Sequence, residues 1–168
     1  MYKTCFLGIG MVQNEWCLEL VCCFFGHRDT PSTVKADLIE CITNLIENEG
    51  ADSFLVGHQG AFDAIVLSVL RGLKEKYPHI TYNVVLAYMP GPTEEYTYAE
   101  PMETMYPEGL ESAPKKFAIS WRNDWMLKNS DCCIAYVKHH FGGSGKFVEK
   151  AERQGKRIIN LASTNITE

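Results

Sequence analysis

The chain has 168 residues, of which 46% are apolar and 22% are charged, which is typical of a single globular domain with a substantial core. Its net charge of −5 argues against a large electrostatic surface for nucleic acid, so a nucleic-acid partner is not expected. No apolar run approaches 18 residues and the N-terminus lacks the basic region of a secretory signal, which argues against a membrane-spanning or secreted protein.

Seven cysteines are present, and four of them form two adjacent pairs, Cys22-Cys23 and Cys132-Cys133. Both pairs lie in apolar runs typical of buried strands, where cysteine acts as a small hydrophobic residue. No CxxC spacing occurs, so neither a zinc site nor a redox dithiol is expected. The pattern indicates a reduced, cytoplasmic setting, and it implies no metal and no cofactor.

The first half of the chain alternates between apolar runs and helical stripes. Residues 1–17 are interpreted as a flanking segment, because Gln13 breaks the GxGxxG pattern that Gly8 and Gly10 begin. The elements predicted next, in chain order, are a strand at 18–25, a helix at 33–49 ending at Gly50, a strand at 53–56, a helix at 62–76 and a strand at 80–88.

The second half begins with residues 93–116, a stretch rich in glutamate and proline that we interpret as a loop or lid insertion. The elements predicted after it are a helix at 120–129, a strand at 131–137, a glycine turn at 142–145, a helix at 146–154 ending at Gly155 and a strand at 157–162. This alternation predicts one α/β domain over residues 1–168, with a mostly parallel sheet and right-handed crossovers.

Three glycine-bearing turns follow predicted strands, and the carboxyl ends of parallel strands are where such sheets bind ligands. The turns are Gly26-His27-Arg28, residues 57–60 with Gly57 and Gly60, and Gly142-Gly143-Ser144-Gly145. The last of these precedes a helix, where unpaired backbone N–H groups and the helix dipole favour an anion. The sequence therefore predicts a ligand site where these turns converge.

The segment Gly142–Lys146 resembles the end of a Walker A motif, but it departs from that pattern at two positions. The pattern GxxxxGK[ST] requires glycine at position 140 and Ser or Thr at position 147, whereas the chain has His140 and Phe147. A P-loop NTPase is therefore not expected, while a phosphate-binding turn remains compatible with the glycines.

Several side chains near these turns have both a functional and a structural interpretation. Arg28 and Arg122 suit a phosphate or carboxylate, or a surface salt bridge. Glu149 suits a ribose hydroxyl or a general base, or an i,i+4 pair with Arg153. Asp63 opens a helix, where capping alone would explain a carboxylate. His27 lies in one of the turns and is a candidate hydrogen-bonding residue.

Four segments resemble the SLOG superfamily of Rossmann-like nucleotide-binding proteins, and within it the small bacterial and phage proteins of the YpsA-like group. The segments are CCFFGHR, GHQGAFD, WRNDWMLKNSDCCIAYV and GGSGKFVEKAERQGKRIINL, and the similarity covers residues 20–165. The resemblance implies a Rossmann-like, three-layer α/β/α fold and a nucleotide ligand. A homo-oligomer is compatible with such a fold.

The same superfamily contains the LOG-type phosphoribohydrolases, whose motif has the form PGGxGTxxE. Gly142, Gly143, Gly145 and Glu149 match this motif, whereas Lys146 and Phe141 replace its threonine and proline. LOG enzymes also have an arginine nine residues before an Asp-x-x-Ile-Ala segment, a spacing that Arg122 and Asp131 keep. The resemblance implies a phosphate on residues 142–146 and implies that Arg122 and Glu149 would be the hydrolytic pair.

Three functions follow as hypotheses. The first is binding of a nucleotide or nucleotide-derived small molecule, with the protein acting as a sensor of that ligand. The second is a nucleoside 5′-monophosphate phosphoribohydrolase acting through Arg122 and Glu149. The third is a DNA-processing accessory protein of the DprA type, whose fold is related. The residues expected to bind the ligand are Gly26, His27, Arg28, Gly57, Gly60, Asp63, Gly142, Gly143, Ser144, Gly145 and Lys146.

Overall fold

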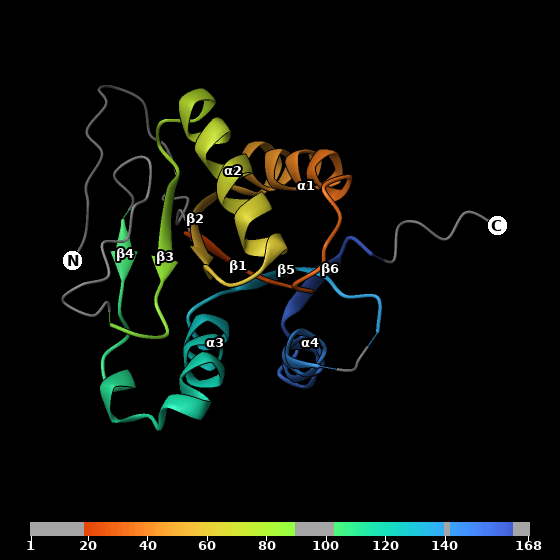
Figure 1. The fold of residues 1–168 in the computed structure, drawn as a ribbon. Helices are drawn as coiled ribbons and strands as arrows, with labels where there is room; N and C mark the ends of the chain where they lie inside the picture. The colour runs from red at the N-terminus through yellow and green to blue at the C-terminus, as the bar shows by residue number, and fades with distance from the viewer. Residues whose placement is uncertain (1–18, 90–102, 140–141, 163–168) are drawn as a thin grey trace.

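A computed structural model of the chain describes residues 19–89, 103–139 and 142–162. Its elements alternate in the predicted order (Figure 1). They are β1 (Leu20–Gly26), α1 (Val34–Glu49), β2 (Ala51–Val56), α2 (Ala61–Lys76), β3 (Thr81–Val85), β4 (Thr104–Met105), α3 (Ala118–Lys128), β5 (Cys132–Tyr136), α4 (Gly143–Arg153) and β6 (Arg157–Asn160), with two short 3-10 turns, Leu110–Ser112 and Lys115–Phe117, before α3.

The strands form one sheet in the order β4-β3-β2-β1-β5-β6, and every neighbouring pair is parallel. Helices α1 and α2 cover one face of the sheet, and α3 and α4 cover the other (Figure 1). The predicted α/β fold, Rossmann-like with three layers and a parallel sheet, is therefore confirmed. In the part of the chain that the structure describes, no helix is long and apolar enough to cross a membrane.

The two adjacent cysteine pairs lie side by side in the centre of the sheet. Cys22 is the register partner of Cys132, and Cys23 that of Cys133. Successive side chains of a strand point to opposite faces, so Cys22 and Cys132 pack under α1 and α2, whereas Cys23 and Cys133 pack under α3 and α4. All four are 0% exposed, which confirms the prediction that they serve as small core residues.

The order of the strands determines where a ligand site can form. From β1 the chain moves outward through β2 and β3 to β4, and it then returns to β5 on the other side of β1. The connections that leave β1 and β5 thus diverge at the carboxyl edge of the sheet. In open α/β sheets the crevice at such a switch point is the usual place for a ligand.

Some predicted boundaries differ from the observed ones. Helix α4 starts at Gly143, three residues before the predicted start at Lys146, because Gly142 is its N-cap with a φ of +95°. Strand β3 ends at Val85 and not at residue 88. The two-residue strand β4 lies within 93–116, which was predicted as a loop or lid with one short helix or strand and of which residues 103–116 are described. The flanking segment 1–17 lies outside the described residues.

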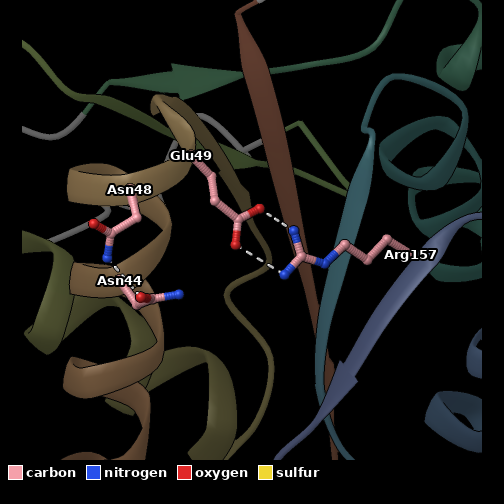
Figure 2. A network of polar contacts seen from close by, with 4 residues as sticks. All are labelled: Asn44, Asn48, Glu49 and Arg157. Atoms are coloured by element: carbon pink, nitrogen blue, oxygen red, sulfur yellow. Dashed lines mark hydrogen bonds and ion pairs between the residues drawn. The ribbon is translucent and has the colours of Figure 1, made fainter.

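The C-terminal end of α1 is joined to β6 by charged side chains. Gly50 ends the helix in the left-handed conformation, with a φ of +73°, as predicted. The guanidinium of Arg157 makes two hydrogen bonds to the carboxylate of Glu49, one of them 2.9 Å between Nη2 and Oε1 (Figure 2). Because α1 has no basic residue in its last turn, Arg157 provides the positive charge that the helix C-terminus favours.

Candidate functional site

A cavity of about 330 Å³ lies at the carboxyl end of β1, between the N-terminus of α2 and helices α3 and α4. Its apolar wall comes from β1 and α3, namely Phe24, Phe25, Ile119 and Met126. The polar residues of its lining are His27, Arg28, Gln59, Asp63, Arg122, Asn123 and Ser144, together with Gly26, Gly57 and Gly143. All three predicted glycine turns therefore contribute to one cavity at the switch point of the sheet.

Arg122 is a buried cation in the wall of this cavity. Its side chain comes from α3, and the residue is only 3% exposed. Nη1 donates a hydrogen bond to the carbonyl oxygen of Val85 at 2.9 Å, and Nε donates to Oδ1 of Asn123 at 2.7 Å. Burial lowers the pKa of Arg122, while the charge of Asp63 raises it. An arginine side chain nevertheless stays protonated in proteins, so the cavity contains a fixed positive charge.

Asp63 provides a buried carboxyl group opposite that charge. It is the third residue of α2 and is 8% exposed. Its Oδ2 accepts a hydrogen bond from the backbone N–H of Gln59 at 2.8 Å, which ties the β2–α2 turn to the start of the helix. Burial raises the pKa of Asp63, and this effect outweighs the opposing effects of the Gln59 hydrogen bond and the Arg122 charge.

Gly57 lies between these two side chains and leaves no room for a larger residue. A Cβ atom at this position would lie 2.4 Å from Oδ2 of Asp63 and 2.9 Å from Nη1 of Arg122. Both distances are far below van der Waals contact. The glycine thus allows the carboxylate and the guanidinium to lie close to each other beside the β2–α2 turn.

Gly26 and Gly60 have packing roles of their own. A Cβ at Gly26 would lie 2.2 Å from Cγ of the buried ring of Phe62. Gly60 has a φ of +113°, and a Cβ there would lie 3.1 Å from the Cα of Arg28. Glycine at positions 26 and 60 is therefore explained by close packing, whether or not a ligand binds nearby.

The segment Gly142–Lys146 contributes two residues to the cavity lining, Gly143 and Ser144. The hydroxyl of Ser144 donates a hydrogen bond of 2.5 Å to the carbonyl oxygen of Gly26, so the start of α4 is tied to the end of β1. Gly145 is buried within the first turn of α4, and Lys146 is exposed. The first turn of the helix, with N–H groups that have no partner within the helix, therefore lies against the cavity.

His27 and Arg28 form the wall at the end of β1. Nε2 of His27 accepts a hydrogen bond of 3.0 Å from the backbone N–H of Lys138, and its ring centre lies 4.4 Å from that of His139. Burial lowers the pKa of His27, and the neighbouring His139 lowers it further. The side chain of Arg28 is exposed, while its backbone carbonyl accepts a hydrogen bond from the N–H of Ala61 at 3.0 Å.

Glu149 lies away from this group of residues. It occupies the second turn of α4, where its Oε2 is 3.3 Å from Nη2 of Arg153, and it is not one of the residues that line the cavity. The structure thus brings Arg122 together with Asp63, and it does not bring Arg122 together with Glu149. Gln59 and Asn123 line the cavity without having been named as ligand-binding residues; Gln59 lies within the predicted turn 57–60, and Asn123 follows Arg122 directly.

No protein-family model and no curated protein match the chain. Among solved structures, it is similar to the X-ray structure of DNA processing protein A (DprA) from Streptococcus pneumoniae, with a TM-score of 0.62 and 16% sequence identity. The similarity covers 84% of this chain and 50% of the DprA chain. The fold is shared. At this identity the likeness extends to the fold alone, and the chain spans half the length of the DprA chain.

Proposed function

We propose that the cavity at the end of β1 binds a nucleotide or a nucleotide-derived small molecule. The observation that carries this proposal is the meeting of three features in one cavity: the amino end of α4, the buried guanidinium of Arg122 and the buried carboxyl group of Asp63. A volume of about 330 Å³ lies within the range of small-molecule sites. The resemblance to the YpsA-like SLOG proteins supports the same ligand class, and a sensor in the cytoplasm is the corresponding role.

The charges around the cavity suggest how such a ligand would be oriented. A phosphate is favoured at the first turn of α4, where Gly143 and Ser144 present backbone N–H groups and the helix dipole is positive. The exposed guanidinium of Arg28 lines the same cavity and can approach a phosphate there from solvent. The apolar wall formed by Phe24, Phe25, Ile119 and Met126 suits a base or another apolar part of the ligand.

Isothermal titration with adenosine, guanosine, cytidine and uridine 5′-monophosphates, NAD and cyclic dinucleotides tests this proposal. We expect saturable binding of at least one of these compounds, with an affinity that falls when Arg28 is replaced by Ala. Arg71→Ala, on α2 and outside the cavity lining, is the matched control for loss of one arginine. If none of these compounds binds to the folded wild-type protein, the proposed function is wrong.

Hydrolysis of a nucleoside 5′-monophosphate is the second candidate, and the position of Arg122 in the cavity wall favours it. The ion pair between Glu149 and Arg153 favours binding without turnover, since the second residue implied by the LOG resemblance is engaged elsewhere. Release of free base from the nucleoside monophosphates, measured by chromatography, separates the two candidates. Release that is abolished by Glu149→Gln would establish the enzyme.

A DNA-processing role rests on the fold likeness to DprA and on nothing in the cavity. The net charge of −5 disfavours binding to the phosphate backbone of DNA. We therefore expect no gel retardation of single-stranded DNA at low or moderate salt, and clear retardation at both salt concentrations would bring this candidate forward.

A further inference from the structure

Asp63 is the acidic residue of the cavity. Among the described residues that line it, every other polar side chain is neutral or basic. The residue is 92% buried by area, with 8% of its surface exposed, so whatever solvent or ligand its carboxyl group meets lies inside the cavity. A carboxyl group in such a place is costly to bury, and the fold requires only part of its hydrogen-bonding capacity.

The part that the fold uses is Oδ2. This oxygen accepts the N–H of Gln59 at 2.8 Å and lies next to the backbone of Gly57. In the described part of the chain, Oδ1 accepts no hydrogen bond, and this oxygen is not completely buried. Oδ1 is therefore the acceptor that Asp63 can offer to a ligand.

The charge of Arg122 restricts what this acceptor can bind. Nη1 of its guanidinium and Oδ2 of Asp63 lie 2.9 Å and 2.4 Å from the same Cβ position at Gly57, so a cationic group placed at Oδ1 would be repelled by a nearby fixed positive charge. A phosphate placed there would instead be repelled by the carboxylate. A neutral hydrogen-bond donor, such as a hydroxyl group, meets neither penalty.

We infer that Oδ1 of Asp63 accepts a hydrogen bond from a ribose hydroxyl of the bound ligand, so that the cavity selects ribonucleotides over their dideoxy counterparts. This inference rests on the proposed nucleotide-binding function and names the part of the nucleotide that the buried carboxyl group recognises. The phosphate then lies toward the first turn of α4, and Arg122 keeps Asp63 in place and compensates its charge.

The test compares matched ligands on matched proteins. Each of the four ribonucleoside 5′-monophosphates and its 2′,3′-dideoxy counterpart is titrated into the wild-type protein, Asp63→Asn and Asp37→Asn. Asp63→Asn keeps an oxygen for the N–H of Gln59, and Asp37→Asn makes the same change in the first turn of α1, outside the cavity lining. We expect the wild type to bind the ribonucleotide about 10- to 100-fold more tightly.

In Asp63→Asn this preference is expected to fall below about threefold, mainly through weaker binding of the ribonucleotide, whereas Asp37→Asn keeps the wild-type ratio. Equal wild-type affinities for the two sugars, or an unchanged ratio in Asp63→Asn, would overturn the inference and leave the proposed function intact. Absence of binding by any nucleotide to the wild type would overturn both. Should Asp63→Asn not fold, Asp63→Glu displaces the carboxylate by one methylene and is expected to reduce the ratio as well.

Discussion

Several positions around the cavity require glycine because another part of the protein packs closely against the backbone there, and not because a ligand needs access. The space that a Cβ would occupy is filled by the ring of Phe62 at Gly26 and by the carboxylate of Asp63 at Gly57. Gly26 thereby allows β1 to pack against Phe62 of α2, and Gly57 leaves room both for the nearby Asp63 and for Arg122 of α3. This is a demand of packing, and the sequence alone does not reveal which atoms fill the space.

Gly26→Ala is expected to destabilise the protein by about 1–3 kcal/mol, because the new methyl group overlaps the Phe62 ring, which is 1% exposed and has no space to move. Gly72→Ala is the control: it lies on the exposed side of α2 with nothing within 4 Å of its Cβ position, so it should stabilise the helix by about 0.5–1 kcal/mol. Urea unfolding measures both. Equal stability of Gly26→Ala and the wild type would show that Phe62 can shift.

Asp63 makes the stability of the protein depend on pH in a direction that its burial determines. Its pKa in the folded state is raised, so the folded protein holds this proton more tightly than the unfolded chain does. The stabilisation is complete below the unfolded pKa of about 3.9 and is lost as the pH rises through the folded pKa.

Relative to the wild type, Asp63→Asn, which has no proton to lose, should therefore become more stable as the pH rises from 3.5 to 7. Urea unfolding of both proteins at several pH values measures the difference. A change in the opposite direction would mean that the Arg122 charge and the Gln59 hydrogen bond outweigh the burial of Asp63.

At the scale of single elements, helix α4 shows what a sequence pattern conveys and what it omits. The strand, the glycines, the helix and the final Gly155 were predicted in the right order, because apolar runs and glycines mark them clearly. The start of the helix was predicted three residues late, since Gly143, Ser144 and Gly145 are poor helix formers in a helix interior. In a first turn their N–H groups need no partner within the helix, and the tie between Ser144 and Gly26 holds them there.

The two glycines at this helix start should respond differently to replacement by alanine. Gly142 has a φ of +95° and a ψ of −176°, a conformation almost restricted to glycine, so Gly142→Ala should cost about 1–3 kcal/mol. Gly143 has no neighbour within 4 Å of its Cβ position, so Gly143→Ala should leave the unfolding free energy unchanged or slightly raised. Because Gly143 lines the cavity, its methyl group should weaken nucleotide binding, and titration alongside urea unfolding distinguishes the two effects.

For the whole molecule, the parallel sheet, its three layers and the convergence of the glycine turns at one edge could be predicted from strand–helix alternation. The proximity of Arg122 to Asp63 could not, because α2 and α3 are separated by β3, β4 and the segment between them. This proximity depends on the strand order, since Arg122 of α3 lies against Val85 at the end of β3 and against the turn that follows β2. For Glu149 the sequence left two interpretations open, a role with Arg122 implied by the LOG resemblance and an i,i+4 pair with Arg153. The structure has the i,i+4 pair.

Cys22 is aligned with Cys132, and Cys23 with Cys133, in the centre of the sheet. The reactivity of these four thiols can therefore be used to follow the unfolding of the sheet. All four thiols are 0% exposed, so an alkylating reagent can reach them only when β1 and β5 separate. Cys41 on α1 is partly exposed, with its pKa raised to about 11 by burial, and should react slowly in the native protein.

Pulsed alkylation followed by mass spectrometry can therefore time the opening of each helical layer separately. Cys22 and Cys132 report on the side of α1 and α2, and Cys23 and Cys133 report on the side of α3 and α4. If the domain unfolds as one cooperative unit, all four thiols should be alkylated at one common rate in a given urea concentration. A faster rate for Cys23 and Cys133 would mean that the layer beside the cavity opens by itself, which would give a ligand a route of entry that leaves the other half of the core closed.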